Sequence, residues 1–228
     1  MRLAREIGLR FLGSVQFLTV FPVPIATVPY EEAMPFFPCT GALVGALAGG
    51  LLVLAGVASL PAGIAAALAL AAWLLATGLL HEDGLADVAD GIRAGRAPER
   101  MLEIMRDSRI GTYGGVALVM ATLLRWQALS EIARANPWFV LGVCVSAAAV
   151  SRGSLVFLAA ISKPAGSGMA ARLVGQVSGW TLLAVGAQMS VAASLTGWRG
   201  TAPILLGSLL LLLVLRTWYH ARLRGVTG

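Results

Sequence analysis

Residues 81–91, HEDGLADVADG, form the densest group of carboxylates in the chain and follow a long apolar run directly. Asp83, Asp87 and Asp90 are spaced i, i+4 and i+7, which gathers them within about 60° of a helix circumference. Three carboxylates this close repel one another by about 4 kcal/mol per pair at about 4 Å and an effective dielectric near 20. The pattern therefore predicts protonation or a bound cation, and hard oxygen ligands suit Mg²⁺ or Mn²⁺.

A solvated charged helix face is the ordinary alternative for such a run. Gly84 and Gly91 argue against it, because glycine weakens a helix and a merely solvated face has no use for it. The same register places Leu85, Val88 and Ile92 on the opposite side, which we expect to be packed. His81 falls on this apolar side and is predicted to be structural or hydrogen-bonded rather than a metal ligand.

Residues 107–114, DSRIGTYG, are the second candidate for chemistry. Their glycines and short polar side chains would bring backbone N–H groups close to an anion where the next apolar run begins. The whole segment 81–111 holds seven of the chain's 11 acidic residues beside five arginines. This mixture is typical of a metal–polyphosphate complex clamped by arginines, although an ordinary loop-to-helix junction explains residues 107–114 equally well.

The composition places these groups at a membrane. The 228 residues are 58% hydrophobic and 12% charged, with a mean hydropathy of +0.83, as in integral membrane proteins. The 27 glycines allow close helix packing and leave room for a homo-oligomer. Cys39 and Cys144 have no metal-ligand spacing, and we expect no disulfide.

The apolar runs predict an all-α bundle of about six transmembrane helices, forming a single membrane-embedded domain over residues 1–228. The predicted spans are 40–59, 62–80, 113–132, 138–161, 178–196 and 202–219. Residues 7–21 are too short for a span and predict an interfacial or re-entrant helix. A further surface helix is expected over 98–110, with Pro98 at its first position.

The basic residues are distributed unevenly about these spans. Six spans put both termini, the 81–111 loop and the 162–177 loop on one side, with 13 Lys and Arg residues. The other side holds only Arg134 and Arg199. The positive-inside rule then predicts an inner-membrane protein whose termini and acidic loop are cytoplasmic, so the net charge of +6 does not indicate nucleic-acid binding.

Three further basic residues are candidates for function. Arg125 and Arg152 lie inside predicted spans, where a charge costs about 2.5–3.5 kcal/mol on insertion scales. For Arg152, which follows Ser151, we favour a polar cavity, whereas Arg125 could pack against an internal acid. Lys163, in the sequence KPAGSG, is a candidate phosphate ligand, with a solvated lysine beside the membrane as the alternative.

Residues 81–91 and 101–114 together resemble the cobalamin synthase family, the adenosylcobinamide-GDP ribazoletransferases. The matching pattern is HxDGLADxADG followed by MLEIMRDSRIGTYG, and weaker similarities include Ser151-Arg152 and the terminal RGVTG. Glu82 stands where the family usually has an apolar residue, which adds a fourth carboxylate. Gly228 stands just before the family's next aspartate, so we expect the natural protein to continue.

The resemblance implies a Mg²⁺-dependent membrane transferase that joins α-ribazole or its 5′-phosphate to adenosylcobinamide-GDP and releases GMP. Asp83, Asp87 and Asp90 would bind Mg²⁺ (or Mn²⁺), and Asp87 or Asp90 would accept the ribazole hydroxyl proton. Besides the substrates and the lipid bilayer, other late-pathway cobamide enzymes are expected partners. The remaining site residues implied are Glu82 and Asp107 as metal ligands, and Arg106, Ser108, Arg109, Arg152 and Lys163 at the phosphates.

Two other functions compete with this interpretation. A membrane prenyltransferase also binds Mg²⁺–diphosphate on Asp-rich helices, but it normally has two comparable motifs, and the second here is only Glu103 and Asp107. A cation-coupled transporter would carry its key charges near the bilayer midplane, whereas these carboxylates are predicted at the cytoplasmic boundary. We therefore expect the ribazoletransferase.

Overall fold

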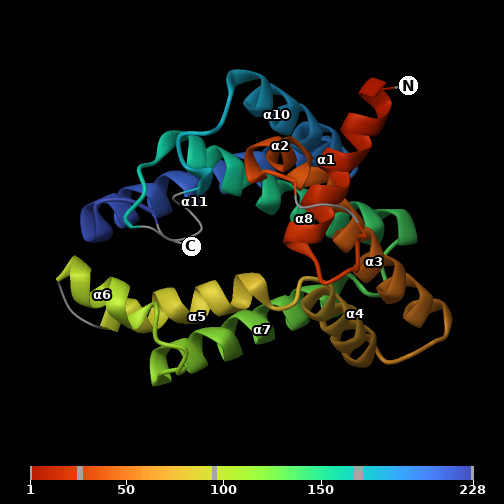
Figure 1. The fold of residues 1–228 in the computed structure, drawn as a ribbon. Helices are drawn as coiled ribbons and strands as arrows, with labels where there is room; N and C mark the ends of the chain where they lie inside the picture. Colours follow the sequence, from red (N-terminus) through yellow and green to blue (C-terminus); the bar gives the residue numbers. More distant parts are fainter. Residues whose placement is uncertain (1, 25–27, 94–96, 167–171, 227–228) are drawn as a thin grey trace.

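The computed structural model describes residues 2–24, 28–93, 97–166 and 172–226, and the described chain is helical, as predicted (Figure 1). Its one extended pairing is an isolated parallel bridge between Pro164 and Val226. In chain order the helices are α1 (Arg2–Leu18), α2 (Tyr30–Ala33), the 3₁₀ helix η1 (Met34–Phe36), α3 (Phe37–Val57), α4 (Ala62–Ala76), α5 (Leu80–Arg93), α6 (Pro98–Ile104), α7 (Thr112–Ile132), α8 (Pro137–Ile161), α10 (Gly179–Ser194) and α11 (Trp198–Leu223).

Within the described ranges, three helical segments are long and apolar enough to cross a bilayer, namely Tyr30–Val57, α8 and α11. A fourth is added if α4 and α5, bent by 87°, count as one span; we place α5 outside the spans because four of its 14 residues are acidic. The predicted number of six is therefore not confirmed. The helices exist at all six positions, but α4 and α10 have only 15 and 16 residues, short of the roughly 20 that a span needs.

The centre of the bundle is the packing of α3 on α8, where small residues let the two backbones meet. A Cβ atom at Gly45 of α3 would overlap the carbonyl of Cys144 in α8. Such contacts are how membrane helices associate when lipid removes the hydrophobic driving force between them. α10 packs on α8, and α4 packs on both α3 and α7, so α4 connects the central helices to the α5–α7 pair.

The acidic helix α5 is aimed by a sharp corner after α4. Gly78 and Leu79 both adopt the left-handed conformation, each with φ of 60°, which ends α4 and turns the chain by 87° into α5. α5 then runs antiparallel along α7, in contact with the first residues of α7 at one end and with Arg125 at the other. Figure 1 shows the two helices side by side.

Several predicted boundaries are wrong by a few residues. The N-terminal helix begins at Arg2 and ends at Leu18 rather than covering 7–21, and the first long span begins at Phe37. The predicted surface helix 98–110 ends at Ile104. The chain after it turns, and Asp107 there accepts the backbone N–H of Arg109, a local side-chain bond that competes with helix continuation.

The predicted packed face of α5 is also wrong. Leu85 and Ile92 are 39% and 49% exposed, whereas Glu82, Ala86 and Gly91 are buried. The physical reason is that α5 packs on α7 and α6 through small residues and carboxylate contacts. Leu85 and Ile92 are directed away from these neighbours, and single exposed apolar side chains are common at protein surfaces. Of the predicted packed set, only Val88 joins a core, the cluster around Met101 and Met105.

Candidate active site

A cavity of about 410 Å³ lies where α5 and α6 end and α7 begins. Both segments singled out in the sequence contribute to it, although the 15 residues 92–106 separate them. The structure therefore joins the acidic motif and the DSRIGTYG motif into one site. The lining residues are Asp90, Arg93, Ile104, Asp107, Arg109, Gly111, Thr112 and Tyr113.

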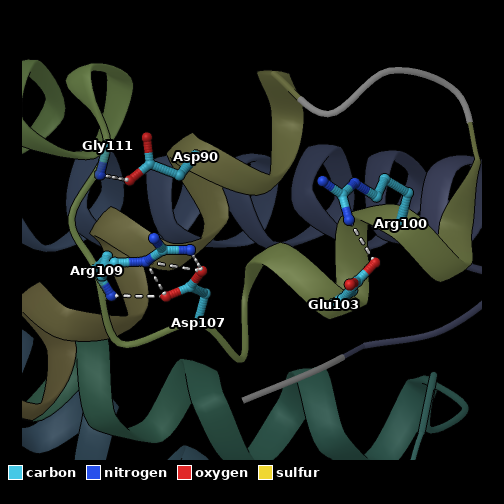
Figure 2. Close-up of polar contacts among 6 residues, drawn as sticks. All are labelled: Asp90, Arg100, Glu103, Asp107, Arg109 and Gly111. Carbon is cyan, nitrogen blue, oxygen red and sulfur yellow. Dashed lines mark hydrogen bonds and ion pairs between the residues drawn. The ribbon is translucent and has the colours of Figure 1, made fainter.

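Asp90 binds the beginning of α7 with both carboxylate oxygens. The backbone N–H of Gly111 donates to Oδ2 at 2.7 Å and that of Gly114 donates to Oδ1 at 2.9 Å; the first of these bonds is drawn in Figure 2. The first N–H groups of a helix have no partner within the helix. Asp90 thus caps α7 from a different helix, and its negative charge suits the positive end of the α7 dipole.

Arg109 and Asp107 form a fork-like ion pair at the mouth of the cavity (Figure 2). Arg109 donates from Nε to Oδ1 at 3.0 Å and from Nη2 to Oδ2 at 2.6 Å. These side-chain hydrogen bonds, with a third from the Arg109 backbone, lower the pKa of Asp107 to about 2. The Arg109 side chain is still 87% exposed, so its guanidinium remains accessible to a phosphate.

Asp83 and Asp87 have no side-chain hydrogen-bond partner among the described residues. Asp83 is exposed and Asp87 half-buried. Burial raises the pKa of Asp87, and the neighbouring charges of Asp83 and Asp90 raise it further. A group that is costly to ionise beside two other carboxylates is the electrostatic setting that a cation relieves.

The described residues contain no group of three His, Cys, Asp or Glu side chains arranged to hold a metal ion by themselves. Mg²⁺ rarely requires such a group, since one or two carboxylates plus substrate phosphates and water complete its shell. The pair Asp83 and Asp87 fits this requirement.

Glu82 faces α7 instead of joining the aspartates. Its Oε1 accepts a hydrogen bond from Arg125 Nη1 at 2.7 Å, its side chain is 10% exposed, and its Oε2 is buried without a partner in the described structure. The prediction that Arg125 packs against an internal acid is confirmed. His81, next to Glu82, is half-buried, and its Nε2 lacks a described partner.

Arg152 is buried at 5% exposure and does not line the cavity. It donates to Ser151 Oγ at 2.9 Å and lies over the ring of Trp73, 5.6 Å from its centroid. The structure thus gives it a packed aromatic neighbour, where the sequence favoured a polar cavity.

The other predicted phosphate ligands lie on the surface around the site. Arg106, Ser108 and Lys163 are exposed. Arg106 Nη2 would lie 3.4 Å from a Cβ atom at Gly166, so Arg106 adjoins the loop that carries Lys163. Ser108 does not line the cavity.

Arg93 lines the cavity but was not predicted from the sequence to be a site residue. The Arg93 guanidinium lies over the Tyr113 ring, 5.4 Å from its centroid, and both residues line the cavity. Arg93 is three residues after Asp90, one helical turn further along α5. This spacing was the available signal, because residues i and i+3 share a helix face.

The chain matches the cobalamin-5-phosphate synthase family over residues 10–228. The chain belongs to this family. The resemblance carried by the two motifs is thereby confirmed. Glu103 and Asp107 would form the second acidic motif of a prenyltransferase. Both are engaged in ion pairs, Glu103 with Arg100 at 2.6 Å and Asp107 with Arg109 (Figure 2).

Named relatives agree with the family. The chain is 36% identical over 237 residues to the adenosylcobinamide-GDP ribazoletransferase of Ralstonia pickettii, covering 100% of the chain and 91% of that protein. It is 40% identical over 195 residues to that of Mesorhizobium japonicum, covering 84% and 73%. The match to the Bradyrhizobium diazoefficiens enzyme, 45% identical over 164 residues, covers 69% of the chain and 62% of the relative, less than two thirds of its length. No solved structure matches.

Proposed function

We propose that this protein is an adenosylcobinamide-GDP ribazoletransferase that works at the cytoplasmic face of the inner membrane. It joins α-ribazole or its 5′-phosphate to adenosylcobinamide-GDP and releases GMP. The observation that carries the proposal is the meeting of the two family motifs at one cavity, which combines Asp90, an accessible arginine and the beginning of a helix. Asp83 and Asp87 do not line this cavity and lie further back along α5.

In the reaction the ribazole hydroxyl oxygen forms a bond to the phosphorus that carries the corrinoid arm. The bond between that phosphorus and the oxygen of GMP breaks, and GMP leaves. Asp87 accepts the hydroxyl proton, because its carboxylate accepts no hydrogen bond from the described residues. Asp90 is less suited, since both of its oxygens already accept backbone N–H groups.

Charge on the diphosphate is balanced from two sides. Asp83 and Asp87 would hold Mg²⁺, or Mn²⁺, which when bound neutralises phosphate oxygens and polarises the phosphorus. Arg109, held by Asp107 yet exposed, binds the departing phosphate, with Arg106 and Lys163 nearby on the surface. Positioning and charge neutralisation of this kind account for most of phosphoryl-transfer catalysis.

Some predicted residues have no direct part in this scheme. Glu82 and Asp107 are paired with arginines, and Arg152 does not line the cavity. At the membrane surface, other late-pathway cobamide enzymes would deliver and remove the substrates.

The test uses purified protein in liposomes with both substrates, and follows GMP release with Mg²⁺ present and after chelation. We expect release that requires both substrates and Mg²⁺. Asp87→Asn should lose activity by about 100-fold or more, as expected for loss of a base. Glu99→Gln, which changes an exposed carboxylate on α6 outside the cavity, is the matched control. Release without ribazole, or full activity in Asp87→Asn, would overturn the assignment.

A further inference from the structure

The four acidic residues of α5 divide into two pairs according to their partners. Glu82 and Asp90 are engaged with α7, the first through the Arg125 side chain and the second through backbone N–H groups. Asp83 and Asp87 have no side-chain partner in the described chain. Ala86, which is buried, lies between Glu82 and Asp90 on the helix surface. Glu82 and Asp90 therefore mark the face of α5 that contacts α7, and Asp83 and Asp87 lie beside that face.

The contact at Asp90 is made to fit a carboxylate. Gly111 and Gly114, which donate to it, are 21 and 24 residues further along the chain. A Cβ atom at either glycine would overlap the Asp90 carboxyl group. By contrast, a Cβ atom at Gly115, the next residue, would have nothing within 4 Å. The two glycines are therefore needed for close approach, and not for backbone conformation.

The position of Asp90 also determines where Arg109 lies. Gly111 is two residues after Arg109, and both line the cavity with Asp90. The hydrogen bond from the Gly111 N–H to Asp90 therefore determines the direction of the preceding loop, which carries the Arg109 guanidinium.

We infer that Asp90 is a positioning residue: it caps α7, holds the Arg109 loop against α5, and leaves substrate and cation to Asp83 and Asp87. The activity tests of this inference rest on the proposed function, whereas the trypsin test described last does not.

The first test compares Asp90→Asn with Asp90→Ala and with Asp87→Asn in the GMP-release assay. Asparagine has only one acceptor oxygen, so Asp90→Asn sets its amide NH₂ against one of the two backbone N–H groups that Asp90 accepts, and Asp90→Ala accepts neither. We expect both Asp90 variants to lose about tenfold activity or more, chiefly through a higher KM for the corrinoid substrate. The Mg²⁺ concentration for half-maximal activity should stay unchanged in both variants and rise in Asp83→Asn.

The second arm alters the contact without altering the carboxylate. Gly114→Ala should reproduce the loss in Asp90→Ala, and combining the two should add little, because both remove one interaction. Gly115→Ala is the matched control and should keep wild-type activity.

The structural test needs no activity. Brief trypsin treatment of the protein in detergent, with cleavage after Arg106 and Arg109 identified by mass spectrometry, reports how firmly the loop is held. Cleavage should be several-fold faster in Asp90→Asn, Asp90→Ala and Gly114→Ala, and unchanged in Gly115→Ala.

If the wild type releases no GMP, the proposed function fails while the trypsin result still decides the role of Asp90. An Asp90→Asn variant as inactive as Asp87→Asn, with unchanged cleavage and a raised Mg²⁺ requirement, would overturn the inference and make Asp90 a ligand. Equal cleavage in all variants would also overturn it.

Discussion

A carboxylate of α5 contacts α7 at each end of the α5–α7 pair, but the two carboxylates differ in their partners and in their surroundings. We call the end at the first turn of α5 the inner end. There Glu82 accepts a hydrogen bond from the Arg125 side chain, and only 10% of the Glu82 side chain is exposed. We call the opposite end, where α5 ends and α7 begins, the outer end. There Asp90 accepts hydrogen bonds from the backbone N–H groups of Gly111 and Gly114 beside a cavity. The inner contact matches charge with charge, whereas the outer contact matches charge with a helix end.

This difference teaches which substitutions each end tolerates. A buried ion pair is costly to break because removal of one partner strands the other. The cap at Asp90 needs two acceptor oxygens, because two N–H groups donate to it, and it tolerates no added bulk on the two glycines. The inner end should therefore control stability, and the outer end should control the geometry of the site.

The largest effect is expected at the inner end. Arg125→Met should destabilise the protein by about 2 kcal/mol, because it removes the hydrogen bond to the Glu82 carboxylate and leaves that carboxylate only the charge of Arg152, with which it forms no ion pair in the described structure. The measurement is the thermal unfolding midpoint in detergent. The double variant Glu82→Leu/Arg125→Met is the control and should recover most of the loss. A single variant as stable as the wild type would show that water already solvates this end.

The outer end should respond less. Asp90→Ala and Asp90→Asn should each cost about 1 kcal/mol of stability, the usual value for loss of a helix cap. Chemical unfolding of both variants in the same detergent measures this. A loss in Asp90→Ala equal to that in Arg125→Met would remove the contrast between the two ends.

Between the ends, Asp87→Asn should slightly stabilise the protein in chelator while removing activity. The folded pKa of Asp87 lies above its unfolded value, so the native state binds more protons and stability falls as pH rises through that folded pKa. The variant should lack this fall in unfolding midpoints measured from pH 4 to 8. Mg²⁺ should abolish the difference at neutral pH, and a destabilised variant in chelator would contradict the account.

The smallest effect is expected for the exposed pair. Asp107→Asn should leave the unfolding midpoint unchanged at pH 7, because water screens such pairs. The depressed pKa of Asp107, about 2, means that any contribution is complete above pH 4 and is lost only as pH falls toward 2. Acid titration followed by circular dichroism checks this window, and a difference near pH 6 would contradict it.

The sequence was sufficient for what depends on neighbouring residues. Helix α5 follows from its own pattern, and the family follows from two short motifs. The membrane setting follows from composition, because each of these features is local or additive.

Contacts between distant residues could not be obtained in this way. The partner of Glu82 lies 43 residues away, and the faces of α5 depend on how α7 crosses it. Periodicity separates a polar side from an apolar side, but in lipid it does not indicate which side is packed. The early end of α6 required the Asp107–Arg109 turn, and the corner after α4 uses Leu79 at positive φ, which residue preferences disfavour.

The distance along the chain between Glu82 and Arg125 has a consequence for biosynthesis. At usual rates of about 5–20 residues per second, Glu82 leaves the ribosome roughly 2–9 seconds before its partner. During that interval its carboxylate has no arginine to pair with, and its burial between helices would be costly. We therefore expect α5 to wait in an aqueous setting at the membrane surface until α7 has been made, so that the two helices enter their final positions together.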